Sequence, residues 1–474
     1  MKLFKKIGLF AGPVAFISML LIGSGTPQEA TFKVVGVALL MIIWWITETV
    51  HLAVTALLPL IFFPLMGVLD SKELAGMYGS NIVFLFMGGF IIALAMEKWE
   101  LHKRIALKII NTIGISPIRV LLGFMIATAL LSMWISNTAT TVMMIPIVGK
   151  VLMILHDRLK FTDQQIKAYS VILLIAVAYS ANIGGTATLV GTPPNVQLAG
   201  IMETQFKEKI EFSTWLLIGI PFSILLLGLT FLMFRFFMPK GMTQSKNNVH
   251  EFELETSGKI SYQEIVVLVI FIFTAVLWTF KSLLNEVLPF ELSDTIIAMI
   301  AGISFFLIPS KRKDERILEW EDMKNLPWGI LILFGGGLSL ALAMKKVGIL
   351  QDLANGFIDL GIDNPLIILF GFTLIALFIT EIMSNVAMVV VFVPVVAEIA
   401  VDMQMNPLYF SIPVTLAASC AFMLPMATPP NALVFATDKI KVGDMVRFGI
   451  ILNIISVIII VLLAHFYFGS IFGF

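Results

Sequence analysis

The chain has 474 residues, of which 59% are hydrophobic and 13% are charged. Soluble domains carry about 25% charged residues, so this composition excludes a water-soluble fold of this size. Lysine plus arginine and aspartate plus glutamate each number 31, and this balance leaves no basic surface for nucleic acid. One cysteine excludes an internal disulfide, and the five scattered histidines lack the spacing of a metal site. We find no nucleophile–base pair that would indicate an enzyme.

Apolar stretches follow one another along most of the chain and predict an all-α polytopic membrane protein. The first, residues 7–23, follows three lysines and is succeeded by a poor cleavage site, so we interpret it as an uncleaved membrane span. Several later stretches are too short to cross a hydrocarbon core of about 30 Å unaided.

The longest polar stretch, residues 239–263, lies near the middle of the chain and predicts a linker between two halves, 1–238 and 264–474. Lysines in this stretch and at the N-terminus place both segments in the cytoplasm, because cytoplasmic loops are enriched in positive charge. Residues 465–474 carry no formal charge when histidine is neutral. This predicts a C-terminus outside the cell and an odd number of crossings.

Three pairs of segments recur in one register, 248 residues apart (384 − 136). They are 85–98 and 333–346, Ser136-Asn137 and Ser384-Asn385, and Pro146 and Pro394. The Thr-Pro-Pro-Asn sequences at 192–195 and 428–431 lie 236 residues apart (428 − 192), so the second half lacks about a dozen residues between its motifs. Two homologous halves in a membrane protein are typical of a transporter that binds substrate at the repeat interface, and such repeats are commonly inverted.

The polar motifs predict helices that are broken inside the membrane. Each proline pair removes backbone donors and interrupts a helix, and irregular backbone at this depth is tolerated only where it lines a cavity or is buried in protein. Free carbonyls and the oxygens of Ser, Thr and Asn suit a hard cation such as sodium, whereas helix N-termini attract an anion. Hydrogen bonding between helices is the alternative for a single Ser-Asn cluster, but recurrence in register favours binding sites.

Neither the Ser-Asn motifs nor the Thr-Pro-Pro-Asn loops contain a lysine or an arginine. Burying an anion without compensating charge is very costly. Co-bound sodium ions would supply the positive charge, and the anion site would be poor until they arrive. The residues by themselves therefore predict a sodium-coupled anion transporter.

The sequence resembles the divalent anion/sodium symporter family, the INDY-type carboxylate transporters. The resemblance covers nearly the whole chain and rests on Trp44-Trp45-Ile46-Thr47-Glu48 with the run at 55–60, both Ser-Asn motifs, both Thr-Pro-Pro-Asn loops, and Pro327-Trp328 before Phe334-Gly335-Gly336-Gly337. It implies a homodimer in the bacterial inner membrane, with two inverted repeats, about eleven transmembrane helices and two re-entrant hairpins with short apolar arms, near 79–112 and 326–360. It also implies an elevator mechanism, in which a transport domain slides against a scaffold domain.

The resemblance also assigns residues to sites, with sodium as the co-transported ion at two or more of them. The first sodium site would use Ser132, Ser136, Asn137 and the backbone of Gly191. The second would use Thr380, the backbone of Met383, Asn385 and the backbone of Ala427. The substrate would meet Asn137, Thr138, Asn385, Val386, Thr192, Pro193, Thr428 and Pro429.

The second motif departs from the family pattern, because Val386 stands where many members have a threonine. Valine lacks the hydroxyl, and a site built around a hydrogen bond to that hydroxyl discriminates strongly between substrates. We expect a C4 dicarboxylate such as succinate, malate or fumarate as the substrate. Citrate and sulfate stay open.

Two other functions stay open at this point. One is a sodium-independent dicarboxylate exchanger on the same fold. The other is a cation/proton antiporter in which Glu381, an intramembrane carboxylate, carries the proton. The simpler interpretation of Glu381 is an internal hydrogen-bonded group near a helix break, and support of the second sodium site is its functional alternative.

Overall fold

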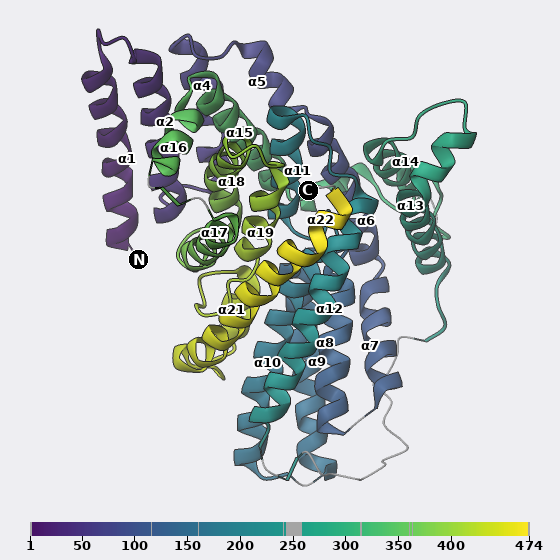
Figure 1. Cartoon of the computed structure of the whole chain (residues 1–474). Helices are drawn as coiled ribbons and strands as arrows, with labels where there is room; N and C mark the ends of the chain where they lie inside the picture. Colours follow the sequence, from purple (N-terminus) through teal and green to yellow (C-terminus); the bar gives the residue numbers. More distant parts are fainter. Residues whose placement is uncertain are drawn as a thin grey trace.

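The computed structural model describes residues 2–114, 116–159, 161–239, 241–242, 258–312, 315–359, 361–362 and 364–472. The regular elements of these residues are helices (Figure 1), and ten helical stretches among them are long and apolar enough to cross a membrane. The predicted all-helical, multi-pass fold is confirmed. Of the linker predicted at 239–263, residues 240 and 243–257 lie outside the described residues.

The first half of the chain forms the helices α1 to α12. Their bounds are α1 Lys2–Gly23, α2 Glu29–Thr47, α3 Leu52–Thr55, α4 Leu58–Leu65, α5 Ser71–Tyr78, α6 Asn81–Lys98, α7 Leu101–Ile113, α8 Pro117–Ser132, α9 Asn137–Leu159, α10 Asp163–Thr186, α11 Pro193–Ile201 and α12 Phe212–Phe237, with a π-helical turn at Met202–Phe206.

The second half forms α13 to α22. Their bounds are α13 Tyr262–Val287, α14 Asp294–Leu307, α15 Trp328–Lys346, α16 Ile349–Ile358, α17 Pro365–Thr380, α18 Asn385–Asp402, α19 Leu408–Ala418, α20 Pro429–Phe435, α21 Val442–Leu463 and α22 Gly469–Phe472, with a 3-10 turn at Trp320–Asn325 and a π-helical turn at Ala464–Phe468.

The helices are layered from lipid-exposed edges to a buried centre. In the view of Figure 1, α1 and α2 lie at one edge and α13 and α14 at the other, with α11 and α19 between them. The edge helices expose apolar side chains, with Phe10 of α1 69% and Phe273 of α13 60% exposed. Nearly all residues of α11 and α19 are buried. Because α11 begins at the first proline pair, that loop lies in the interior, whereas the loop 419–428 after α19 is partly exposed, with Met426 75% exposed.

Several helices of the two halves begin at equivalent residues. Both ends of α8 and α17 differ by 248 (365 − 117 and 380 − 132), and α9 and α18 begin at Asn137 and Asn385, again 248 apart. The starts of α11 and α20 differ by 236 (429 − 193). The repeat of the sequence is therefore also a repeat of helices.

The regions expected to form re-entrant hairpins contain α6 with α7 and α15 with α16. In each region one helix is short and one is longer. The helices α7 and α16 have 13 and 10 residues. The helices α6 and α15 have 18 and 19 residues, belong to stretches long enough to cross a membrane, and end at lysines. The short apolar helices include α8 and α17, with 16 residues each, which end at the Ser-Asn motifs. Re-entrant entry at 79–112 and 326–360 stays a prediction.

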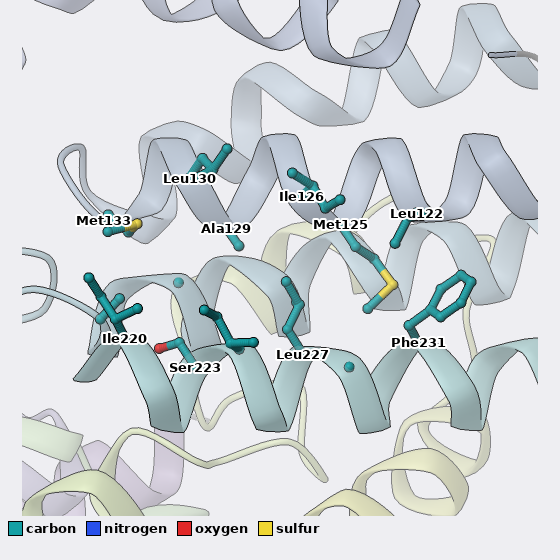
Figure 2. Close-up of a pocket in the computed structure, with 14 residues that line it drawn as sticks. Leu122, Met125, Ile126, Ala129, Leu130, Met133, Ile220, Ser223, Leu227 and Phe231 are labelled. Carbon is teal, nitrogen blue, oxygen red and sulfur yellow. The ribbon is translucent and has the colours of Figure 1, made fainter. Parts of the chain in front are cut away.

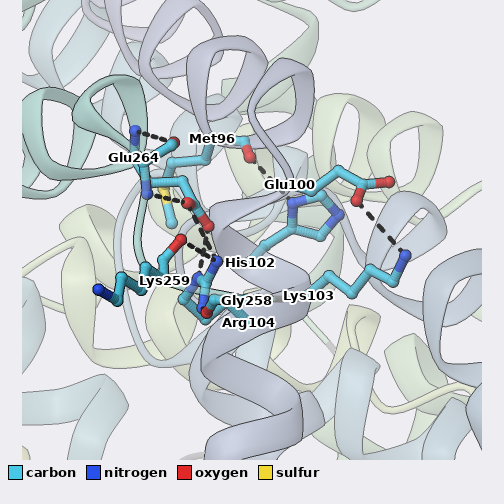
Figure 3. Close-up of polar contacts among 9 residues, drawn as sticks. Met96, Glu100, His102, Lys103, Arg104, Gly258, Lys259 and Glu264 are labelled. Carbon is cyan, nitrogen blue, oxygen red and sulfur yellow. Dashed lines mark hydrogen bonds and ion pairs between the residues drawn. The ribbon is translucent and has the colours of Figure 1, made fainter. Parts of the chain in front are cut away.

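A partly buried ion pair links the two halves where α7 meets α13 (Figure 3). Arg104 Nη2 donates to Glu264 Oε2 at 3.2 Å, and Arg104 Nη1 donates to the Gly258 carbonyl at 3.0 Å. Glu264 also accepts from the Ser261 backbone amide at 2.7 Å, which caps the start of α13. The charge-assisted hydrogen bonds fix the start of the second half against the first.

Candidate cation and anion sites at two helix breaks

The first Ser-Asn motif lies in the turn 133–136 between α8 and α9, so it interrupts a helix pair instead of lying within one helix. Ser132 is fully buried, and its Oγ donates to Asn137 Oδ1 at 2.7 Å. Ser136 is exposed, and its Oγ accepts from the Ala139 amide at 3.2 Å. The structure therefore brings Ser132 and Asn137 together, whereas the Ser136 hydroxyl caps the first turn of α9.

Several oxygen atoms surround Gly191 at the same place. A Cβ atom on Gly191 would lie 2.5 Å from the Gly185 carbonyl oxygen and 3.0 Å from both Met133 O and Thr188 Oγ1. A Cβ on Gly185 would lie 2.5 Å from Asn137 Oδ1. These are the neutral oxygen ligands that a hard cation takes. The chemistry of this donor set suits a sodium ion, and a side chain at position 191 would collide with it.

Sequence analysis missed three members of this oxygen set, which are the Thr188 hydroxyl and the carbonyls of Met133 and Gly185. Thr188 lies in the loop after α10, and its hydroxyl donates to the Met133 carbonyl. None of the three residues belongs to a repeated motif, and a backbone carbonyl carries no signal in the sequence. The polar character of Thr188 inside an apolar run is the only sign that could have identified it.

The second Ser-Asn motif repeats the geometry of the first in the turn 381–384 between α17 and α18. Thr380 is fully buried, and its Oγ1 lies 2.7 Å from Asn385 Oδ1 and 2.8 Å from the Ala418 carbonyl oxygen. Thr380 and Asn385 occupy the positions of Ser132 and Asn137, shifted by 248. One hydroxyl–amide pair thus ends each short helix.

The asparagines of the Thr-Pro-Pro-Asn loops hold the two helix breaks together. Asn195 Nδ2 donates to the Thr188 carbonyl at 2.9 Å, and Asn431 Nδ2 donates to the Leu424 carbonyl at 3.1 Å. Thr188 and Leu424 are equivalent at the offset of 236. A broken helix leaves carbonyls without intrahelical partners, and in both halves the asparagine satisfies one of them.

The predicted substrate residues differ in their accessibility. Thr138 and Pro429 are exposed and Pro193 is half-buried, whereas Thr192 and Thr428 are 4% and 3% exposed. Thr428 Oγ1 is engaged by the Asn182 side chain at 3.0 Å and the Asn431 amide at 3.3 Å.

Val386, the equivalent of the exposed Thr138, is 7% exposed and belongs to a buried apolar cluster with residues of α2, α15 and α16. Ala427 is 8% exposed and Met383 is half-buried, and both lie in loops that flank Asn385 and Thr428 in the chain. The roles of Val386, Met383 and Ala427 stay predictions.

Glu381 is 3% exposed and holds the second break in place. Its Oε1 accepts from the backbone amides of Phe422 and Met423 at 2.8 and 2.9 Å, and its Oε2 accepts from the Leu424 amide at 3.1 Å. Asn453 Nδ2 of α21 also donates to Oε1 at 2.8 Å. The internal, hydrogen-bonded role predicted for Glu381 is confirmed.

Aromatic side chains fix the first motif turn against α12 and α13. The Trp134 ring lies parallel to that of Trp278, with centroids 6.4 Å apart, and packs edge-on against Phe271 at 4.8 Å. Phe212 stacks on Trp278 at 4.5 Å. Among the described residues, no lysine or arginine makes an ion pair or hydrogen bond with either motif turn or proline-pair loop, and no metal-binding group of His, Cys, Asp and Glu is found.

Residues 5–473 match the family model described as the sodium:sulfate symporter transmembrane region. The chain belongs to this family. It is 40% identical over 476 residues to the sodium-dependent dicarboxylate transporter SdcS of Staphylococcus saprophyticus, with 97% of this chain and 91% of that protein covered. It is 39% identical to the protein of the same name from Staphylococcus aureus, with 97% and 90% covered.

Two solved structures share the fold of this family member. The YdaH transporter of Alcanivorax borkumensis aligns with a TM-score of 0.61 and 15% identity, over 88% of this chain and 89% of that one. MtrF of Neisseria gonorrhoeae aligns with a TM-score of 0.58 and 14% identity, over 95% and 97%. The family membership confirms the resemblance stated from the motifs, and it makes the chain a membrane transporter and not an enzyme.

Proposed function

We propose that this protein is a secondary active symporter that imports a C4 dicarboxylate together with sodium. The observation that carries this proposal is the pair of oxygen-rich helix breaks, one in each half, each ending a short helix with a hydroxyl–asparagine pair. Relatives that are about 40% identical over nearly their whole length bear the name sodium-dependent dicarboxylate transporter, which supports both the ion and the substrate class.

The absence of basic side chains explains why sodium and the anion would bind together. A dicarboxylate brings two negative charges into a site that no described lysine or arginine contacts. Sodium ions at the two breaks would neutralise that charge, and the anion would in turn raise the affinity for sodium, because such coupling is reciprocal. Asn137 and Asn385 are suited to both tasks, since each offers a carbonyl oxygen to the cation and an amide to a carboxylate.

The movement that carries the substrate across the membrane is also part of the proposal. We propose two inverted repeats, divided at 239–263, a homodimer, and an elevator motion of the part that holds both breaks. The equivalent bounds of α8 and α17 and the equivalent starts of α9 and α18 support the repeat. The 16-residue helices α8 and α17 reach about 24 Å, which is less than a hydrocarbon core of about 30 Å, so both motif turns would lie inside the membrane.

The decisive experiment is uptake of radiolabelled succinate into proteoliposomes that contain the purified protein. We expect uptake with an inward sodium gradient and none when potassium replaces sodium. Excess unlabelled malate, fumarate, citrate and sulfate, added in parallel, rank the substrates. Uptake that ignores sodium but requires internal dicarboxylate would replace the symporter by an exchanger, and proton movement without any organic anion would indicate the antiporter.

A further inference from the structure

An apolar groove runs along the surface between α8 and α12 (Figure 2) and has a volume of about 470 Å³. Its wall on α8 extends from Leu122 to Met133, and its wall on α12 extends from Phe231 to Ile220, so the two helices are antiparallel. The other lining residues are also apolar, except for Ser223. Such a groove on the surface of a membrane helix pair opens onto hydrocarbon and not onto water.

The shape of the groove comes from small residues. A Cβ on Gly184 of α10 would lie 2.3 Å from the Ala129 carbonyl oxygen of α8, so these helices touch and form the floor. Gly228 of α12 has no atom within 4 Å of its Cβ position, which leaves the space beside it open. The Ser223 hydroxyl bonds to the Ile183 carbonyl at 2.9 Å and therefore presents no free polar group to the groove.

Two arginines stand at the same end of this groove. Arg119 precedes Leu122 by three residues on α8, and Arg235 follows Phe231 by four residues on α12. Residues three or four apart lie on one helix face, so both arginines continue the walls of the groove. Both are exposed, and neither side chain makes an ion pair or a hydrogen bond with another residue of the described part of the chain. This end adjoins the predicted cytoplasmic linker.

We propose that the groove binds an anionic phospholipid of the cytoplasmic leaflet, with one acyl chain between α8 and α12 and the phosphate between Arg119 and Arg235. The α8 wall spans eleven residues (133 − 122), or about 16 Å. One leaflet of a hydrocarbon core of about 30 Å is about 15 Å thick, so the groove matches the depth of one chain. Arginine forks bind phosphate oxygens in pairs, which completes the match at the charged end.

The lipid would reach the wall of the first candidate cation site. The inner end of the groove is Met133, and its carbonyl accepts the Thr188 hydrogen bond beside Gly191. A chain packed there would limit the freedom of the turn 133–136. This consequence rests on the proposed function, but lipid binding itself does not, and the test below measures binding alone.

The test is native mass spectrometry of the detergent-purified protein with added phosphatidylglycerol or phosphatidylcholine that have the same acyl chains. We expect the wild-type protein to retain phosphatidylglycerol preferentially. Replacing both arginines, Arg119→Gln with Arg235→Gln, should lower that preference by about thirtyfold, because a basic residue at an anionic lipid surface contributes roughly a fivefold preference.

The matched control removes two positive charges elsewhere, with Lys150→Gln and Lys167→Gln. Lys150 lies thirteen residues from Asn137 along α9, as Arg119 lies thirteen residues from Ser132 along α8, and both lysines are exposed. The control should leave the lipid preference unchanged. Equal retention of the two lipids by the wild-type protein would overturn the proposal. So would an equal loss of the preference for phosphatidylglycerol in the control, because the arginines would then contribute only to the general positive charge of the cytoplasmic side.

A second pair of variants tests the groove itself. Gly228→Trp should fill it and reduce retention of both lipids, whereas Gly371→Trp on α17 should not, although it too has no atom within 4 Å of its Cβ position. Size-exclusion chromatography with light scattering checks that each variant stays folded and reports its oligomeric state. Unchanged lipid retention in Gly228→Trp would overturn the proposal. So would dissociation of a dimer by this variant alone, because a second copy would then be the occupant.

Discussion

The two helix breaks carry the same motifs in the same register, but different groups stabilise the unwound backbone in each half. In the first half, α10 stays helical to Thr186, and the loop 187–192 follows. In the second half, α19 ends at Ala418, which corresponds to position 182 (418 − 236), so one further turn is unwound. The unwound turn frees the amides of residues 422–424, and Glu381 accepts all three.

The residue at the position of Glu381 in the first half is Met133 (381 − 248), which has only its backbone carbonyl to offer. There the helix is intact, few amides are free, and the Thr188 hydroxyl bonds to that carbonyl. The comparison teaches that the hydroxyl–asparagine pairs proposed as cation ligands are duplicated, whereas the groups that support them are not. We therefore expect equivalent substitutions to act alike at the ligands and differently at the supports.

The largest effects should come from the ligands, where the two halves are alike. Asn137→Ala and Asn385→Ala should each reduce sodium-driven succinate uptake by about a hundredfold, because each removes a contact with a charged group worth ~3 kcal/mol. Proteoliposome uptake measures this, and elution of both variants at the wild-type position in size-exclusion chromatography is the control. Full activity in either variant would mean that the helix break with that asparagine is not part of the binding site.

Glu381→Leu should destabilise the protein much more than the equivalent substitution in the first half. It leaves three backbone amides and the Asn453 side chain without their acceptor in a buried place, and unsatisfied buried groups cost ~1–3 kcal/mol each. We expect a loss of at least ~3 kcal/mol, seen as a lower unfolding temperature in detergent.

Met133→Leu is the matched variant in the first half, and it should change the unfolding temperature little because the carbonyl remains. Equal stability of the two variants would mean that the unwound turn does not depend on the carboxylate.

The space beside the first cation site should also distinguish the halves. Gly191→Ala places a methyl group 2.5 Å from the Gly185 carbonyl oxygen, and overpacking of this kind costs ~1–3 kcal/mol. We expect the sodium concentration for half-maximal uptake to rise about tenfold. Position 427, the equivalent in the second half, already has alanine. Ala427→Gly should therefore change the sodium concentration for half-maximal uptake less than threefold. A larger effect of Ala427→Gly than of Gly191→Ala would mean that the loop of the second half, and not that of the first, limits sodium binding.

The sequence identified the features that depend on repeated side chains and missed those that depend on backbone. The offset of 248 predicted that Asn137 would match Asn385, and the family resemblance added Ser132 and Thr380. The structure places a hydroxyl beside the asparagine in both halves. The unwound turn after Ala418 carries no such signal, since it depends on Glu381 reaching three amides from another helix. The Met133 carbonyl was missed for the same reason.

Helix lengths and burial were less predictable from the sequence. At 79–112 and 326–360, the apolar helices α6 and α15 continue into terminal lysines, whereas α7 and α16 have only 13 and 10 residues. The re-entrant hairpins there stay a prediction. The proposed substrate contact of Val386 rested on its place in the motif. Its side chain packs with α2, α15 and α16, a tertiary arrangement that a local motif does not encode.

Val386→Thr should have the smallest effect and tests the last difference between the motifs. The equivalent Thr138 is exposed, but Val386 is 7% exposed in an apolar cluster. A hydroxyl placed there loses ~1–2 kcal/mol of stability unless it finds a partner. We therefore expect a small decrease in unfolding temperature and an unchanged order of succinate, malate, citrate and sulfate in competition assays. A changed order of substrates would mean that Val386 contacts the anion, and that α18 exposes the Val386 side chain when substrate is bound.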